Sequence, residues 1–253
     1  MKGIILAGGL GTRLRPVTYV VNKNLLPIYN KPSIFYSLNL LKQAGITDIA
    51  IIAEHNYIED FKLILGGGAD FGVNLHYYND SPLKKGPVSA LLHAKSFANN
   101  QRTCVVFADN VFDITIKDQV NNFTEGAHFF LKEVNNPSSF GVANFDKNNK
   151  LINIEEKPKY PKTNFASIGL YLFDEDLFKF LQKVKPSKNG EYLMPSLIKY
   201  YIKYKELGYT IIKGFWQDIG TFDGMYKASE YFYKKEKALI KNKVYKKVKN
   251  IKL

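Results

Sequence analysis

The sequence predicts an α/β protein with a doubly wound, mostly parallel, Rossmann-like mixed sheet. Three observations support this fold class: strand-length apolar runs alternate with helix-like segments in the first half, a glycine-rich loop follows the first strand, and the second half is rich in strands. Alternating strands and helices are typical of parallel sheets with helical crossovers. We expect the sheet-rich second half to be layered on the first.

The first half supplies the alternating elements. Strands are expected over residues 4–7, 48–53, 73–78 and 103–108, and helices over 34–44, 56–65 and 88–98. Ser33 can cap the first of these helices, and Gly45 can end it. The triple glycine at 66–68 indicates a helix end and a turn, because no strand precedes it and no cations follow it.

The pattern of the second half begins near residue 127. Strands are expected over 128–134, 141–145, 151–155, 167–173, 209–212 and 215–218, and helices over 175–183, 191–206 and 223–235. No repeat or low-complexity linker separates the two parts. We therefore expect one domain over residues 1–233, with halves 1–126 and 127–233, followed by a lysine-rich tail over 234–253.

The glycine-rich loop is the first candidate site. Its glycines are Gly8, Gly9 and Gly11, and the cations after them are Arg13, Arg15, Lys23 and Lys31. Glycines leave room for backbone N–H groups to approach phosphate oxygens. The order Gly-Gly-x-Gly differs from the P-loop and dinucleotide-binding patterns, so a tight turn is the alternative interpretation. The nearby cations favour a polyphosphate.

The net charge of +13 is concentrated in the tail, because residues 234–253 contain nine lysines and one glutamate. A solvated, lysine-rich helix is the simplest interpretation, and nucleic-acid binding is the alternative. No recognition motif accompanies the charge, so we expect no nucleic-acid partner.

The remaining bulk features indicate a cytoplasmic protein. No apolar run is long enough to cross a bilayer, and a Gly-Gly pair stands where a signal peptide would continue. Cys104 is the only cysteine and lies in an apolar run, which excludes an intrachain disulfide and a cysteine metal cluster.

Two aspartates are candidate metal ligands. Asp109 ends an apolar strand, and Asp218 precedes a Gly-Thr turn. Mg²⁺ commonly takes one or two carboxylates together with substrate phosphate oxygens. A cap or turn role is the alternative for either residue alone. Glu156 and Lys157 follow another strand, where Lys157 can hold a second phosphate and Glu156 can accept hydrogen bonds from hydroxyl groups. A polar strand end before Pro158 is the alternative, and for this motif alone it is the better one.

Taken together, these segments resemble the sugar-1-phosphate nucleotidyltransferases, most closely the glucose-1-phosphate thymidylyltransferases. The matching segments, in family order, are Lys2 to Pro16 (KGIILAGGLGTRLRP), Lys23 to Pro32 (KNLLPIYNKP), Asp109 to Phe112 (DNVF), Phe140 to Val142 (FGV), Glu155 to Pro158 (EEKP), Gly169 to Tyr171 (GLY), Gly190-Glu191, and Asp218 to Thr221 (DIGT). They span nearly the whole chain, which is more specific than any single motif.

The resemblance implies a role for each matching residue. The nucleotide would contact Gly8, Gly9, Gly11, Thr12, Arg13, Asn79, Gly86 and Asn110, and the acceptor would contact Gly141, Glu156, Lys157, Gly169 and Tyr171. Arg13 and Lys23 would be catalytic, while Asp109 and Asp218 would bind Mg²⁺. The nucleotide half would be 1–126 and the acceptor half 127–233.

The implied reaction is attack of an acceptor phosphate on the α-phosphorus of a nucleoside triphosphate, with release of pyrophosphate. The favoured substrates are dTTP and glucose 1-phosphate, in nucleotide-sugar synthesis for surface polysaccharide or capsule. The family's two base-reading glutamines are absent around Asn79–Ser89, so a cytidylyltransferase or uridylyltransferase with another phosphorylated acceptor, not necessarily a sugar, is an alternative. A non-catalytic nucleotide-sugar sensor is another. A homo-oligomer is compatible with the sequence.

Overall fold

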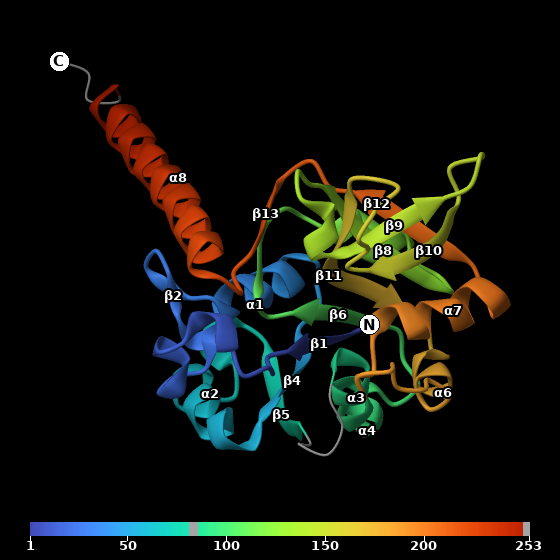
Figure 1. The fold of residues 1–253 in the computed structure, drawn as a ribbon. Coiled ribbons are helices and arrows are strands. Elements are labelled where there is room, and N and C mark those ends of the chain that lie inside the picture. Colours follow the sequence, from blue (N-terminus) through green and yellow to red (C-terminus); the bar gives the residue numbers. More distant parts are fainter. Residues whose placement is uncertain (81–85, 250–253) are drawn as a thin grey trace.

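The computed structural model describes residues 1–80 and 86–249, with side chains described as far as residue 240. Nine strands form one central sheet in the order β10-β9-β11-β6-β1-β4-β5, and off this path β8 pairs with β11 while β12 pairs with β8 (Figure 1). These strands are β1 (Lys2–Leu6), β4 (Asp48–Glu54), β5 (Asn74–Asp80), β6 (Thr103–Phe107), β8 (Ala127–Glu133), β9 (Gly141–Phe145), β10 (Leu151–Glu156), β11 (Phe165–Phe173) and β12 (Leu207–Ile211).

Helices and two short ribbons complete the fold. The α-helices are α1 (Ile34–Gln43), α2 (Ile58–Leu65), α3 (Pro87–Leu91), α4 (Lys95–Ala98), α5 (Lys117–Asn122), α6 (Leu177–Leu181), α7 (Met194–Tyr204) and α8 (Phe222–Lys249). One ribbon pairs β2 (Pro27–Ile28) with β3 (Lys31–Pro32), and the other pairs β7 (Asn110–Asp113) with β13 (Phe215–Asp218).

The sheet is mixed, which confirms the predicted fold class. Strands β6, β1, β4 and β5 run parallel to one another. Strand β11 then pairs antiparallel with β6, so strands from the second half of the chain extend the sheet formed by the first half. Because the parallel strands all point the same way, their carboxyl ends meet at one edge, where ligands bind in open α/β sheets.

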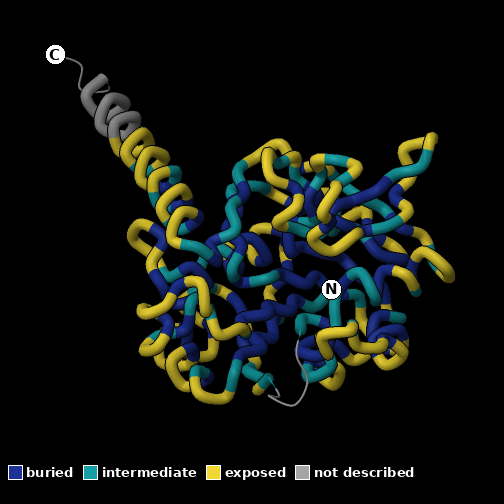
Figure 2. Tube along the Cα trace, in the orientation of Figure 1, coloured by how far each residue is buried: buried dark blue, intermediate teal, exposed yellow. Residues whose placement is uncertain are grey.

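Burial on both faces explains why the parallel strands are continuous apolar runs. Neighbours in β1 face opposite sides: Ile4 packs with residues of α3, α6 and α7, whereas Ile5 packs with residues of α1 and α2. Figure 2 shows buried residues along the strands and exposed residues on the outer faces and loops. This two-sided packing fixes the positions of the strand ends.

The structure differs locally from the sequence-based expectations. The expected helix 88–98 is divided, with a 3₁₀ turn over Leu92–Ala94 between α3 and α4. Strand β7 and helix α5 were not predicted, because neither has a long periodic pattern. Strand β7 forms instead through long-range pairing with β13, with Asn110 opposite Asp218.

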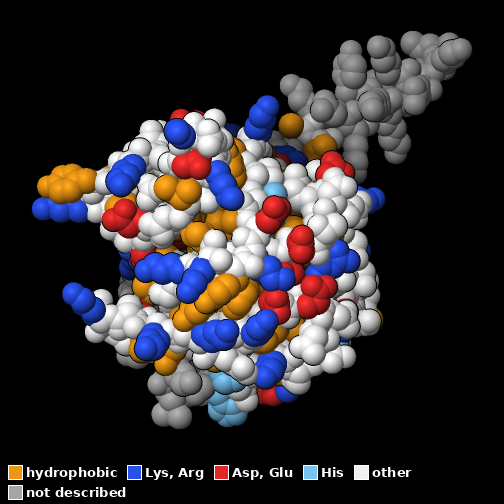
Figure 3. Space-filling model, turned by 90° about the vertical axis from the view of Figure 1, so that its right-hand side faces the viewer, with side chains coloured by type: hydrophobic (Ala, Val, Ile, Leu, Met, Phe, Trp, Pro, Cys, Tyr) orange, Lys and Arg blue, Asp and Glu red, His pale blue; other side chains and the backbone are white. Residues whose placement is uncertain are grey.

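Helix α8 crosses the predicted boundary at 233/234 without a break. Its first turns pack on the body through a small cluster in which Phe232 meets Ile28 and Val111, while its later part points away from the body (Figure 1). Within the described chain, no helix has the length and apolar character that crossing a membrane requires. On the face drawn in Figure 3, basic side chains are interspersed with acidic ones.

Candidate active site

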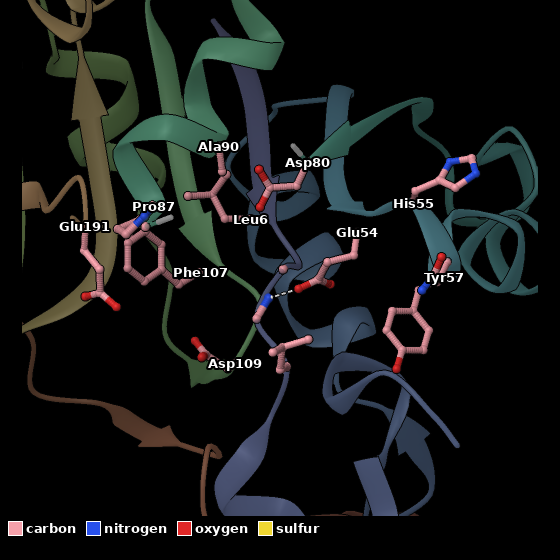
Figure 4. Close-up of a pocket in the computed structure, with 15 residues that line it drawn as sticks. Leu6, Glu54, His55, Tyr57, Asp80, Pro87, Ala90, Phe107, Asp109 and Glu191 are labelled. Atoms are coloured by element: carbon pink, nitrogen blue, oxygen red, sulfur yellow. Dashed lines mark hydrogen bonds between the residues drawn. The ribbon is translucent and has the colours of Figure 1, made fainter. Parts of the chain in front are cut away.

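A cavity of about 810 Å³ opens at the carboxyl edge of the parallel strands (Figure 4). Gly8 and Gly9 come from the loop after β1, Glu54 and Tyr57 from the end of β4 and the turn after it, Asp80 from the end of β5, Pro87 and Ala90 from α3, and Phe107 and Asp109 from β6 and its end. The cavity therefore lies where the fold predicts a ligand.

The glycine-rich loop presents its backbone to this cavity. Gly9 has a φ of +98°, and a Cβ atom there would lie 3.3 Å from Lys23 Nζ. Its N–H group donates a hydrogen bond of 2.5 Å to Glu54 Oε1. A carboxylate oxygen thus occupies the acceptor position at Gly9, which shows that this N–H is oriented to bind an anion.

Lys23 and Asp109 form the central ion pair of the site. Lys23 Nζ lies 2.5 Å from Asp109 Oδ2, although 86 residues separate them in the sequence. Burial disfavours the charged carboxylate, but the Lys23 charge and hydrogen bond outweigh it and hold the pKa of Asp109 below its ordinary value. Asp109 is therefore an anion at neutral pH.

Asp218 joins Asp109 through the β7–β13 ribbon. The Ile219 N–H donates to the Asp109 carbonyl over 2.9 Å, and the Gly220 N–H donates to Asp218 Oδ1 over 2.9 Å. Burial and the negative charge of Asp109 raise the pKa of Asp218 above its ordinary value. Two mutually repelling carboxylates are a donor set that a divalent cation would neutralise.

This pair fits Mg²⁺ with substrate oxygens as the remaining ligands. Within residues 1–80 and 86–249, no group of three or more His, Cys, Asp or Glu side chains is arranged to hold a metal ion. The described site therefore contains no set of protein side chains that could hold a metal ion alone. Asp109 and Asp218 could supply two of the ligands, with substrate oxygens as the others.

Arg13 lies against the turn that follows Asp218. A Cβ atom on Gly220 would be 2.5 Å from Arg13 Nη2, so the guanidinium occupies the space that a side chain at Gly220 would need. The Arg13 charge also favours ionisation of Asp109 and Asp218. The structure thus brings Arg13, Lys23 and both aspartates together, as the sequence predicted for one phosphate-binding site.

Asn110 supports Asp109 from behind. Its side chain is buried, accepts a 2.7 Å hydrogen bond from Trp216 Nε1 and donates a 2.8 Å hydrogen bond to Asp109 Oδ1. Sequence reasoning placed Asn110 among the nucleotide-binding residues. Both ends of its amide are occupied by protein groups, so in this structure Asn110 orients Asp109 instead of facing the cavity.

The expected acceptor residues lie on the other side of Asp109, in β9 and β10. Gly141 is paired with Glu156, and a Cβ atom on Gly141 would lie 3.4 Å from Glu156 Oε2. Lys157 Nζ lies 3.6 Å from Glu156 Oε1, and the Lys157 side chain is 65% exposed. A cation, a carboxylate and a glycine therefore form an accessible group, as expected for a phosphorylated acceptor.

Gly169 and Tyr171 have packing roles in the structure. Gly169 has a φ of +65°, and a Cβ atom there would lie 2.9 Å from Phe107 Cβ. Tyr171 is only 4% exposed, packs between Phe107 and Phe129, and its hydroxyl accepts a hydrogen bond from Ser167. The structure therefore places Tyr171 in the core, and its expected contact with the acceptor stays a prediction.

At the end of β5, the residue that lines the cavity is not the one that the sequence predicted. Asp80 lines the cavity, whereas Asn79 is exposed and does not line it, because neighbouring strand residues point to opposite sides. Gly86 lines the cavity as expected, and a Cβ atom there would be 2.6 Å from the Tyr192 carbonyl oxygen. Residues 81–85 of the expected base-reading segment lie outside the described residues. Thr12 is exposed in the 3₁₀ turn after Gly11.

Sequence reasoning missed Glu54. It follows an apolar strand in the same way as Asp109, so the rule that singled out Asp109 also applies to it. Phe107 was also missed, because an aromatic residue within an apolar strand carries no signal beyond core packing.

Comparison with known proteins gives the family. The profile of the nucleotidyl transferase family matches residues 2–235. A glucose-1-phosphate thymidylyltransferase from Neisseria meningitidis serogroup A is 40% identical over 238 residues, covering 91% of this chain and 82% of the relative.

Solved structures agree. A Bacillus anthracis protein described as a candidate glucose-1-phosphate thymidylyltransferase, solved with sucrose, superposes with a TM-score of 0.86 at 40% identity, covering 91% of this chain and 94% of that one. A UDP-glucose pyrophosphorylase in complex with UDP-glucose superposes with a TM-score of 0.82 at 26% identity, covering 92% and 98%. The chain therefore belongs to the nucleotidyl transferase family, and glucose-1-phosphate thymidylyltransferases are among its relatives.

Proposed function

We propose that this chain transfers a nucleoside monophosphate from dTTP to glucose 1-phosphate, with Mg²⁺, and releases pyrophosphate. The observation that carries the proposal is the meeting of Arg13, Lys23, Asp109 and Asp218 beside the glycine-rich loop. The names of the thymidylyltransferase relatives supply the choice of first substrates. The product would be an activated sugar for surface polysaccharide or capsule.

Asp109 and Asp218 would hold Mg²⁺ between them. When bound, the ion would neutralise charge on the phosphate oxygens. The side chains of the protein would contribute to catalysis by positioning the two substrates. Lys23 and Arg13 would contact the triphosphate and stabilise charge on the departing pyrophosphate. Lys157 would hold the acceptor phosphate, and Glu156 would accept hydrogen bonds from the acceptor's hydroxyl groups.

In-line attack requires no covalent intermediate with the protein. The glycine-rich loop lies on one side of Asp109, and the Gly141–Glu156–Lys157 group belongs to the other. Two phosphates held from opposite sides would place the attacking oxygen against the α-phosphorus. Holding both reactants in this orientation can supply a large part of the rate enhancement.

A second candidate is a cytidylyltransferase or uridylyltransferase. The observation that favours it is the carboxylate wall beside Gly8: a Cβ atom there would lie 3.2 Å from Asp80 Oδ2 and 3.8 Å from Glu54 Oε1. Asp80 belongs to the segment in which the family's base-reading glutamines are absent, so a base other than thymine is a candidate. The sensor alternative is disfavoured because the charged reaction centre is complete.

The test is a pyrophosphate-release screen with Mg²⁺. Common nucleoside triphosphates, with dTTP, CTP and UTP first, are combined with glucose 1-phosphate and a panel of other phosphorylated acceptors. Release with dTTP and glucose 1-phosphate supports the first candidate, and release only with CTP or UTP supports the second. Nucleotide binding without release from any pair would support the sensor and contradict both enzyme assignments.

A further inference from the structure

Glu54 lies at the carboxyl end of β4, which is the parallel neighbour of β1. Figure 4 shows its side chain pointing toward the loop after β1, where Oε1 accepts the Gly9 N–H. The second oxygen, Oε2, is buried and has no hydrogen-bond partner among the described residues. A buried carboxylate oxygen without a donor is costly, so a ligand that donates a hydrogen bond there would be favoured.

The cavity beside Glu54 is on the nucleoside side of the reaction centre. Asp109 lies at its border, and none of the acceptor group Gly141, Glu156 and Lys157 lines it. The remaining lining comes from the glycine-rich loop, from apolar groups such as Phe107 and Ala90, and from polar residues that include Asp80 and Glu191. If the triphosphate binds the loop, as the proposed function requires, the sugar and base must extend into this cavity.

Glu54 is close to the part of the cavity that the nucleoside sugar would occupy. Because Oε1 hydrogen-bonds Gly9, the carboxylate lies within one hydrogen bond of the phosphate-binding loop. Moving outward from the α-phosphate, the first hydrogen-bond donors of a nucleotide are the hydroxyl groups of its sugar. An ionised carboxylate can only accept hydrogen bonds, and each of its oxygens can accept two, so Glu54 can keep the Gly9 N–H on Oε1 and still accept from two adjacent hydroxyl groups.

The topology supports the same assignment. In dinucleotide-binding folds, a glycine-rich loop follows one strand, and an acidic residue farther along the chain accepts a hydrogen bond from the ribose 2′-hydroxyl. Here the glycine-rich loop follows β1, and Glu54 ends β4, which pairs with β1 through contacts such as Leu6 opposite Ile52. A carboxylate at the end of one strand and a glycine-rich loop at the end of its parallel neighbour can contact the sugar and the phosphate of the same nucleotide.

We propose that Glu54 accepts hydrogen bonds from the sugar hydroxyls of the nucleotide and selects ribonucleotides over 2′-deoxyribonucleotides. A ribonucleotide offers two adjacent hydroxyl groups, whereas its deoxy counterpart offers only one. Loss of a hydrogen bond to a charged group predicts a discrimination of about tenfold to a hundredfold within a matched pair. This inference rests on the proposed function only in placing the nucleoside in this cavity, and it favours the second candidate over dTTP.

A purely structural role for Glu54 makes a different prediction. If the carboxylate only holds Gly9, its loss would disturb the phosphate-binding loop. Both members of a ribo and deoxyribo pair would then be weakened by the same factor. The ratio of the two affinities therefore separates sugar recognition from loop support.

The experiment measures dissociation constants by titration calorimetry in the presence of Mg²⁺, with CTP against dCTP and UTP against dUTP. Pyrophosphate release is measured for the same pairs. The test variant is Glu54→Gln, which keeps the size of the side chain but removes its charge. Glu59→Gln controls for loss of an exposed glutamate on α2.

We expect the wild-type chain to bind the ribonucleotide of each pair at least about tenfold more tightly. Glu54→Gln should bring the ratio close to one, while Glu59→Gln should keep it. Equal binding of both members by the wild-type chain, or an unchanged ratio in Glu54→Gln, would overturn the inference. Selective binding without pyrophosphate release would leave it standing and contradict the proposed function, whereas no binding of any nucleotide would overturn both.

Discussion

Lys23 Nζ and Asp109 Oδ2 lie 2.5 Å apart, so the cation expected to contact phosphate and the carboxylate expected to bind metal neutralise each other. A second pairing of this kind joins the Gly9 N–H to Glu54. Nucleotide binding must therefore exchange contacts within the protein for contacts with the ligand. Substitutions that remove one partner of such a pair are expected to change nucleotide affinity and kcat by different factors.

Lys23→Ala should lower kcat/KM about a hundredfold or more, because it removes a cation positioned beside the reacting phosphates. The partner Asp109 would lose its compensating charge, so its pKa should rise toward and beyond the ordinary value as burial becomes dominant. Steady-state pyrophosphate release measures the first effect. Lys62→Ala, which removes an exposed lysine of α2, is the control and should retain full activity. Equal activity of the two variants would contradict the role of Lys23.

Asp109→Asn and Asp218→Asn should each lower kcat by about a hundredfold or more at saturating Mg²⁺, because each removes half of the proposed carboxylate pair. Removing the metal with a chelator should stop the reaction of the wild-type chain, and added Mg²⁺ should restore it. Asp60→Asn on the exposed face of α2 is the matched control. If both site variants remain near full rate, Mg²⁺ is not held by these residues.

Asp113→Asn should destabilise the docking of helix α8. Asp113 accepts hydrogen bonds from Tyr231 over 2.6 Å and from Lys235 over 2.5 Å. Burial opposes its ionisation, but these two groups outweigh burial and lower the pKa of Asp113. We expect a loss of about 1 kcal/mol in the free energy of unfolding at neutral pH.

The pH dependence of this loss has a definite sign. A carboxyl with a lowered folded-state pKa stabilises the fold above its unfolded-state pKa, and the contribution disappears as the pH falls through the folded-state value. The difference between wild type and Asp113→Asn should therefore shrink as the pH falls below about 4, the ordinary pKa of an aspartate. Urea unfolding at several pH values measures it, with the exposed Asp118→Asn as control. A constant difference across this range would show that the charge of Asp113 is not responsible.

Gly169→Ala should destabilise the fold more than Gly190→Ala. Both glycines have positive φ values, +65° and +79°, so alanine is strained at either position. At Gly169 the new methyl group would also lie 2.9 Å from Phe107 Cβ, whereas at Gly190 no atom lies within 4 Å. Strain alone predicts about 1 kcal/mol at Gly190, with a further loss at Gly169 from the collision. Thermal unfolding compares the two, and equal losses would contradict close packing at Gly169.

Much of this site could be predicted because strand ends are visible in the sequence. The apolar runs before Gly8 and Asp109 indicate two parallel strands, and parallel strands bring their carboxyl ends to one edge. The same reasoning places Lys157 just beyond a strand. Each of these residues follows a strand that shows in the sequence as a local pattern. The pattern before Gly8 and Asp109 is an apolar run because those strands are buried on both faces of the sheet.

The remaining features depend on contacts between distant segments. Asn110 turns inward because Trp216, which is 106 residues away, donates to it. Tyr171 is buried because Phe107 and Phe129 pack against its ring. Asp80 lines the cavity and Asn79 does not, because neighbouring residues of a strand point to opposite sides. No local pattern encodes these choices.

The contact between Arg13 and Gly220 has a consequence for how the protein becomes active during synthesis. The loop that begins at Gly8 leaves the ribosome some two hundred residues before Asp218 and Gly220. An N-terminal fragment that ends before β13 lacks the second carboxylate and the turn that meets Arg13. Such a nascent chain has the glycine-rich loop but not Asp218, so the proposed reaction centre can assemble only after β13 has been made.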